Sequence, residues 1–241
     1  MSLVYRKRPR NTKHKNHGFK KKFDEIIKKY ENHDSESDES SNSSDDDDFH
    51  HDNKNHDVSC KDNKIYFKAY VTDDTISTLI KIIEAKNRKF KKFSSNKLVE
   101  RAEPKPLYLH ITSHGGSLLA CFRAIDAIKR SHIPIYTVVD GYAASAGTLM
   151  SVVGKKRYMT PSSYMLIHQL QSGSIGKYWE MKDDNENIDQ WMKDIYNIYV
   201  THSKIQEREL KEYLSHDLWW KSDKCLEMGL IDAIYENDVV E

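Results

Sequence analysis

Residues 141–169 read GYAASAGTLMSVVGKKRYMTPSSYMLIHQ, a stretch that holds a serine and a histidine in settings suited to chemistry. Ser145 lies among very small residues, AASAG at 143–147, which keep its hydroxyl accessible and allow a substrate backbone to come close. His168 follows the apolar run MLI at 165–167 and is expected to end a strand. A hydroxyl is a weak nucleophile at neutral pH and needs an adjacent base to take its proton. The serine and the histidine together therefore predict a serine hydrolase.

Each of the two residues, taken alone, has a simpler explanation. Most Ala-Ser-Ala runs reflect tight helix packing, and a histidine on an apolar strand is more often a satisfied core residue. The stretch also differs from the nucleophile elbow of the α/β-hydrolases, G-x-S-x-G, because Ala143 stands where the first glycine would be. The hydrolase interpretation therefore depends on other segments of the chain.

The turn SHGG at 113–116 supplies such a segment, between a predicted strand and a predicted helix. Its glycines allow backbone N–H groups to point at one spot without a Cβ in the way, and the helix N-terminus behind them favours negative charge. Ser145 lies at a second strand–turn–helix junction, so the amide of Ala146 is expected to point at the same spot. Two such amides form an oxyanion hole, in which each donor contributes about 3–4 kcal/mol. Alone, Gly-Gly would be an ordinary tight turn.

Strand and helix patterns alternate along the rest of the chain, which favours an α/β domain with largely parallel strands. Apolar alternation predicts strands at 65–71, 107–111, 135–139, 157–159, 164–168 and 230–235. Helical spacing predicts helices at 76–86, 118–129, 145–153, 179–203, 205–215 and 223–228. We also expect Gly141 to end the third strand, residues 87–104 to form a loop, Ser222 to cap the last helix and Gly229 to stop it.

Residues 1–62 differ in composition from residues 63–241, which we assign to one folded domain. The tail begins with a basic arm and continues with an acidic tract rich in Ser and Asp. Its apolar residues are too few to repay the entropy of ordering, so we expect disorder. A nucleic-acid or localisation arm and a phosphorylated tether are the functional interpretations. A solvated extension whose two halves neutralise each other is the simpler one.

Overall composition excludes several classes of function. The chain has 38 Lys and Arg against 37 Asp and Glu, so charge gives no case for nucleic acid or an anionic membrane as partner. Its three cysteines, Cys60, Cys121 and Cys225, lack metal-ligand spacing and indicate free thiols in a reducing compartment. No apolar run approaches the about 20 residues of a membrane span, and the N-terminus lacks the apolar region of a secretory signal. We therefore expect a cytoplasmic location.

Residues 65–234 resemble the proteolytic subunit of Clp protease, the ClpP family of the crotonase-like fold. GYAASAG at 141–147 resembles the family's nucleophile segment G-x-A-A-S-M-G, and MLIHQ at 165–169 resembles its histidine segment M-I-H-Q-P. SHGG at 113–116 resembles its oxyanion turn S-P-G-G, and EMGLIDAI at 227–234 resembles its terminal E-Y-G-L-V-D-x-I. The four motifs occur in the family's order, which makes the resemblance specific although each motif is short.

The resemblance implies a Ser-His-Asp triad in chain order. Its serine falls on Ser145 and its histidine on His168, and its aspartate falls on Asp217 by the distance from the terminal motif. Asp217 would accept the imidazole N–H and so orient the ring. Asp223 and Asp232 are the rival assignments, and an ordinary loop or helix cap is the simpler role for Asp217.

The resemblance also implies a fold, an assembly and partners. Gly116 and Ala146 match the oxyanion-hole positions, and repeated strand-strand-helix units would carry a protruding handle helix at 179–203. The implied protein is a serine endopeptidase of unfolded proteins, a homo-oligomer of stacked heptameric rings fed by an AAA+ ATPase. No metal or small cofactor is required, and the chain has no Gly-Lys-Ser/Thr phosphate loop with which to hydrolyse ATP itself.

Several positions depart from the family pattern and leave two alternatives open. His114 and Leu170 replace prolines, Ser215-His216 stands where an acidic-Arg pair is common, and Trp219-Trp220 replaces Phe-Leu. A catalytically silent scaffold subunit in mixed rings would explain altered ring contacts. Another crotonase-like enzyme, such as an acyl-CoA hydratase, would also use paired amides around an acyl oxygen, although it does not need a Ser–His pair.

Overall fold

Five parallel strands form the centre of the sheet, in the order β2-β3-β4-β5-β8. The structure is a computed structural model that describes residues 58–94 and 104–236. The strands are β1 (Val58–Lys61), β2 (Lys64–Phe67), β3 (Leu107–Ser113), β4 (Ile135–Ala144), β5 (Lys156–Met159), β6 (Tyr164–Leu166), β7 (Trp219–Lys221) and β8 (Ala233–Ile234). β1 pairs antiparallel with β2 at one edge, and β7 pairs antiparallel with β6.

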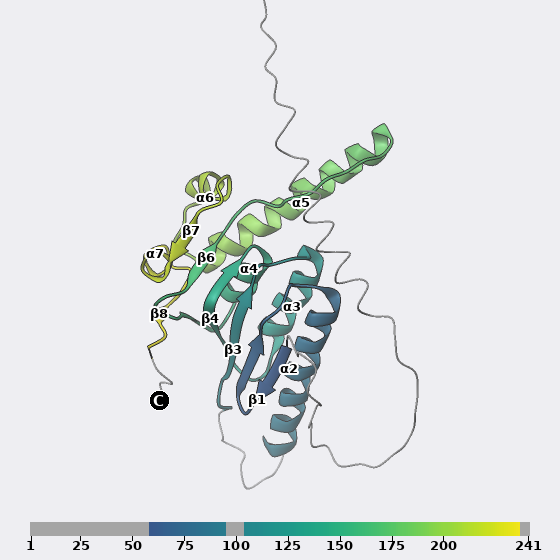
Figure 1. Cartoon of the computed structure of the whole chain (residues 1–241). Coiled ribbons are helices and arrows are strands. Elements are labelled where there is room, and N and C mark those ends of the chain that lie inside the picture. The colour runs from purple at the N-terminus through teal and green to yellow at the C-terminus, as the bar shows by residue number, and fades with distance from the viewer. Residues whose placement is uncertain (1–57, 95–103, 237–241) are drawn as a thin grey trace, which may run out of the picture. The chain divides into compact units, whose positions relative to one another are not determined.

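The helices complete a mixed α/β fold, as the alternating sequence pattern predicts. They are α2 (Asp73–Ser94), α3 (Leu118–Arg130), α4 (Ala146–Val152), α5 (Tyr178–His202), α6 (Glu207–Leu214) and α7 (Ser222–Glu227). α2 and α3 pack side by side against one face of the sheet (Figure 1). Ile76 and Leu79 of α2, Ala124 and Ile128 of α3, and Leu109 of β3 are all buried in one hydrophobic cluster.

The folded domain begins earlier than the expected boundary at residue 63, because β1 starts at Val58. β1 and β2 form a hairpin whose two-residue turn contains Asp62, with a φ of +52°. A left-handed residue at such a turn matches the twist of the two strands, and Asp tolerates this conformation better than most residues. β1 therefore lies within the stretch assigned to the charged tail. The remainder of the predicted tail, residues 1–57, lies outside the described residues.

The expected loop at 87–104 is wrong in its first half, because α2 continues to Ser94. Phe90 repeats the apolar spacing of Ile83 one heptad later and packs against the core. The side chain of Asn87 accepts hydrogen bonds from the Ile133 N–H at 3.0 Å and from the Ser131 hydroxyl at 3.2 Å, which ties α2 to the segment before β4. Basic residues in the last turn complement the helix dipole, so their charge does not end the helix.

Gly141 does not end the third parallel strand, which continues to Ala144. Ile111 pairs with Val139, but Ser113 pairs with Ala143, so β4 carries two extra residues at this point. Gly141 has a φ of +85°, a conformation that glycine adopts readily and that creates a bulge. The extra residues are hydrogen-bonded, since Thr112 donates to the Asp140 carbonyl and the Gly141 N–H donates to the Ser163 hydroxyl.

The C-terminal helices largely match their predicted ranges. α5 extends away from the sheet (Figure 1), and only Ile195 and Tyr199 in it are buried. Gly229 follows α7 with a φ of +71°, as expected of a helix stop. Ser222 is the first residue of α7 and not its cap, because its hydroxyl donates to the Pro161 carbonyl instead.

Arg157 in β5 joins three segments near the end of the chain. Its guanidinium donates to the Asp232 carboxylate and to the backbone carbonyls of His202 and Gly229. Burial alone would raise the pKa of Asp232, but the hydrogen bonds and the positive charge of Arg157 outweigh it and hold that pKa below its ordinary value. The ionised pair therefore stabilises the folded state.

This pair predicts acid sensitivity. A carboxyl whose pKa is lower in the folded state than in the unfolded state stabilises the protein above the unfolded pKa of about 4, and this contribution is lost as the pH falls through the folded pKa. In urea titrations below pH about 4, the free energy of unfolding of the wild type should therefore fall more steeply than that of Asp232→Asn. If the free energy of unfolding fell equally with pH in the two proteins, the pair of Arg157 and Asp232 would contribute nothing to stability.

Candidate active site

The register of the sheet brings the sequence motifs to one edge. Ser113 of β3 pairs with Ala143 of β4, and Ala143 pairs with Met165 of β6. All three strands are parallel, so the segments that leave their carboxyl ends emerge together. These segments contain the SHGG turn, Ser145 and His168.

Ser145 occupies an unusual backbone conformation at the junction of β4 and α4. Its φ is +54° and its ψ is −126°, values that residues with a Cβ rarely adopt. The surrounding structure holds it there: its N–H donates to the Leu166 carbonyl at 2.9 Å, and its own carbonyl accepts from the N–H and the hydroxyl of Thr148. Backbone strain of this kind occurs mainly at functional sites.

The SHGG turn packs directly against this junction. A Cβ on Gly115 would lie 2.6 Å from the Ser145 Cβ and 2.8 Å from the Ala144 carbonyl oxygen. A Cβ on Gly116 would lie 2.3 Å from the Val71 carbonyl oxygen. Both glycines also have positive φ. The missing side chain of Gly115 allows the turn to approach the Ser145 junction, and that of Gly116 allows it to approach Val71.

Gly115→Ala should therefore destabilise the protein by about 1–3 kcal/mol, through the overlap with Ser145 and the cost of its φ of +92°. The matched control is Gly173→Ala, because a Cβ at Gly173 would meet nothing within 4 Å. Urea denaturation measures both changes. Equal effects at the two positions would contradict the close packing of the turns.

Two backbone amides at these turns have no partner among the residues that the structure describes. Val71 forms a parallel bridge in which its N–H donates to the Gly115 carbonyl at 2.8 Å and its carbonyl accepts from the Ser117 N–H at 2.7 Å, which leaves the Gly116 N–H unused. Ala146 begins α4, so its N–H has no partner within the helix. Gly116 and Ala146 line the same pocket.

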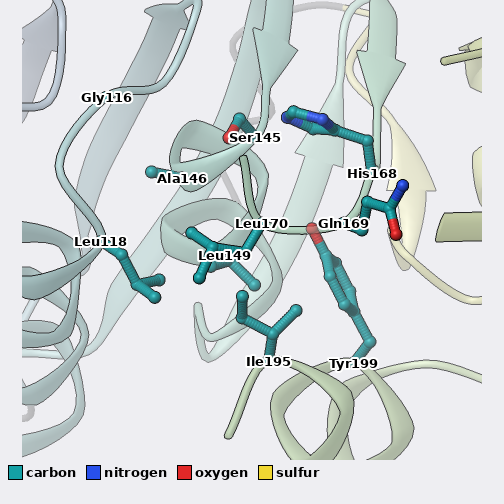
Figure 2. Close-up of a pocket in the computed structure, with 10 residues that line it drawn as sticks. All are labelled: Gly116, Leu118, Ser145, Ala146, Leu149, His168, Gln169, Leu170, Ile195 and Tyr199. Atoms are coloured by element: carbon teal, nitrogen blue, oxygen red, sulfur yellow. The ribbon is translucent and has the colours of Figure 1, made fainter. Parts of the chain in front are cut away.

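His168 lies beside Ser145, and Figure 2 shows its imidazole extending towards the serine. No hydrogen bond joins the two side chains in the described part of the chain. The Nδ1 atom of His168 is 3.5 Å from Asp217 Oδ1, an ion-pair distance that is long for a hydrogen bond. The side chain of His168 is 20% exposed, whereas that of Asp217 is 81% exposed.

The three candidate aspartates lie in different surroundings. The antiparallel pairing of β7 with β6 sets Trp219 opposite Leu166, and this pairing brings Asp217 next to His168. Asp232 is engaged by Arg157 instead, and Asp223 lies in the first turn of α7.

An apolar pocket of about 30 Å³ adjoins Ser145 (Figure 2). Its remaining lining residues are Leu118, Leu149, Gln169, Leu170, Ile195 and Tyr199. Ile195 and Tyr199 come from α5, the helix that the sequence predicts to be the handle between rings. Their helical spacing indicates that they share a face, but it does not reveal that this face meets the serine.

Two positions next to the site that depart from the family pattern, His114 and Trp219, make aromatic ring contacts. His114, which stands where the resembling family has proline, packs against Tyr142 in a tilted arrangement with ring centroids 4.4 Å apart and stacks on Tyr70 at 5.9 Å. Tyr142 in turn meets Trp219 edge-on at 6.5 Å. These ring contacts restrain the turn by packing.

The described residues contain no group of three or more His, Cys, Asp or Glu side chains arranged to hold a metal ion. Within the same residues no helix is both long and apolar enough to cross a membrane.

Comparison with known proteins identifies the family. The family model described as Clp protease matches residues 74–238, which is more than half of the chain. The chain belongs to the Clp protease family. Within this family it is a divergent member, because its curated relatives are only about 30% identical to it.

Three relatives illustrate this distance. ATP-dependent Clp protease proteolytic subunit 2 of Treponema denticola is 30% identical over 135 residues, which cover 55% of this chain and 68% of the relative. Subunit 1 of Chlamydia caviae is 28% identical over 176 residues, covering 71% and 85%. The proteolytic subunit of Porphyromonas gingivalis is 28% identical over 143 residues, covering 58% and 64%. A Clp protease fold is thus retained although most side chains have changed.

Proposed function

We propose that this chain is a serine endopeptidase, the proteolytic subunit of a Clp-type protease. The observation that carries the proposal is the packing of two strand–turn–helix junctions against each other. It places the Ser145 hydroxyl, the unpartnered amides of Gly116 and Ala146, and His168 around one pocket. An activating base beside a serine and hydrogen-bond donors for the oxyanion are the groups that favour acyl transfer to that serine.

The proposed reaction begins with attack by Ser145 Oγ on a peptide carbonyl, while the His168 imidazole takes the hydroxyl proton. The Gly116 and Ala146 N–H groups donate to the oxygen that becomes negative. When the C–N bond breaks, His168 returns the proton to the leaving amine. A water molecule, deprotonated by His168, then attacks the ester carbonyl on Ser145. As the bond between the carbonyl carbon and Ser145 Oγ breaks, His168 returns this proton to Oγ and the carboxylic acid product leaves. Asp217 accepts the Nδ1–H of His168, which keeps the ring in the required tautomer and stabilises its charged form.

The assembly and partners are proposed from the relatives and from α5. The relatives are named as proteolytic subunits of an ATP-dependent protease, which supports an assembly of several subunits that works with ATP hydrolysis. From the family resemblance we propose stacked heptameric rings of this chain, a separate AAA+ ATPase and unfolded proteins as substrates. The first part of α5 exposes Tyr178 and Trp179, at 72% and 65%, as a helix would that packs between rings. We propose that the complex works in the cytoplasm and without a metal or small cofactor.

A catalytically silent ring subunit is the second candidate. It is favoured by the exposure of Asp217 and by the missing hydrogen bond between Ser145 and His168 in the described residues. Hydrogen bonds in catalytic sites are often long before substrate binds, and a second subunit would cover exposed groups. The complete set of groups therefore favours the active enzyme. No feature of the site favours an acyl-CoA hydratase.

The test is hydrolysis of fluorogenic peptides by the purified full-length chain, with its particle mass measured in the same solution. The active enzyme should form a multi-subunit particle that cleaves peptides without ATP. A particle of ring mass that cleaves no peptide in a panel of different sequences would identify the silent subunit instead.

A further inference from the structure

The peptide unit between Ser145 and Ala146 carries two groups of the site at once. The Ser145 carbonyl and the Ala146 N–H belong to one rigid plane and point in opposite directions. A contact that holds the carbonyl therefore also sets the direction of the N–H. The Ala146 N–H has no partner among the described residues. Its direction towards the pocket therefore depends on the contacts that hold the Ser145 carbonyl.

Thr148 holds that carbonyl from inside α4. Its N–H donates to the Ser145 oxygen at 2.9 Å and its hydroxyl donates to the same oxygen at 2.6 Å. A threonine hydroxyl has a single hydrogen, which this second bond uses. In the hydrogen bond between Thr148 Oγ1 and the Tyr199 hydroxyl, the tyrosine must therefore be the donor.

Tyr199 reaches this network from α5, and Figure 2 shows its hydroxyl extending from that helix towards the pocket. Thr148 is fully buried and Tyr199 is 1% exposed, so water does not compete for these hydrogen bonds. Burial also holds the pKa of Tyr199 well above its ordinary value, which keeps the donating proton on the phenol. Hydrogen bonds in such a chain polarise and strengthen one another.

We propose that Tyr199 and Thr148 are positioning residues: through the Ser145 carbonyl they hold the peptide plane so that the Ala146 N–H meets the oxyanion. The same hydrogen bonds stabilise the strained backbone of Ser145, whose φ is +54°. The inference rests on the proposed peptidase function. It extends the site by a fully buried hydroxyl pair that touches no reacting atom.

Two variants remove one hydroxyl each and keep the shape of the side chain, Tyr199→Phe and Thr148→Val. Removal of a whole oxyanion donor costs about 10²–10³ in kcat, so misdirecting one should lower kcat about 10-fold and leave KM nearly unchanged. Because the two hydroxyls act through one chain, the double variant should lose about 10-fold as well, and not about 100-fold. Thr148→Ser keeps the hydroxyl and should retain wild-type kcat.

The matched control is Tyr196→Phe, a tyrosine three residues earlier on α5 whose ring contacts Lys211 and which should keep wild-type kinetics. Wild-type kcat in Tyr199→Phe and Thr148→Val, a change confined to KM, or losses that multiply in the double variant would each overturn the inference. An inactive wild type would instead contradict the proposed peptidase function, and with it the positioning role. An active wild type with unaffected variants removes the positioning role alone.

Discussion

Replacing Ser145 with alanine should lower peptide hydrolysis by at least about 10⁴-fold and leave the free energy of unfolding nearly unchanged. Without the hydroxyl no ester can form, and only binding and the oxyanion amides remain to assist attack by water. The Ser145 hydroxyl donates no hydrogen bond within the described structure, so its loss removes none from the folded state. Hydrolysis of a fluorogenic peptide measures the activity, and urea denaturation measures the stability.

Ser151→Ala is the matched control for this change. Ser151 lies in the adjacent helix α4, and its buried hydroxyl has no hydrogen-bond partner among the described residues. This variant should hydrolyse peptides at the wild-type rate and be at least as stable, since it removes an unsatisfied buried polar group. Comparable activity in Ser145→Ala and the wild type would exclude Ser145 as the nucleophile.

Asp217→Asn should reduce kcat by about 10³–10⁴-fold with little change in stability. An amide in place of the carboxylate favours the wrong tautomer of His168 and no longer stabilises the charged ring. The carboxylate is 81% exposed and 3.5 Å from the imidazole, so its contribution to folding is small. The measurement is the dependence of peptide hydrolysis on substrate concentration, which separates kcat from KM.

Asp223→Asn serves as control, because Asp223 was a rival by sequence but lies in the first turn of α7. It should keep wild-type kinetics. If instead Asp223→Asn abolished hydrolysis while Asp217→Asn did not, Asp217 would not be the third member of the triad. This outcome would not affect the assignment of Ser145 as the nucleophile.

The parallel α/β fold was predictable because its strands and helices carry their periodicity locally. The predicted ends of a strand and a helix were wrong where tertiary contacts outweighed the local sequence signal. Gly141 looked like a strand end, yet the Thr112 and Ser163 side chains satisfy the bulge and the strand continues. Lys-rich residues after Lys86 looked like a loop, yet Phe90 and Asn87 anchor the helix to its neighbours.

The sequence motifs of the candidate site could be recognised in the sequence. The contacts that hold the site residues in place could not. Ser145, His168 and Gly116 lie in short segments of recognisable composition. The positive φ of Ser145 and the approach of Tyr199 arise only when distant segments pack together. Helical spacing places Tyr199 on the same face of α5 as Ile195, but it cannot show that the tyrosine hydroxyl forms a hydrogen bond with Thr148 behind the serine.

The central claim is that Ser145 is an activated nucleophile, and a fluorophosphonate probe tests it most directly. The full-length wild-type chain, incubated with the probe as the particle it forms in solution, should gain the mass of one adduct per subunit. Peptide mapping should place that adduct on Ser145, and Ser145→Ala should gain no mass. An unlabelled wild-type particle, or an adduct on another residue, would contradict the account.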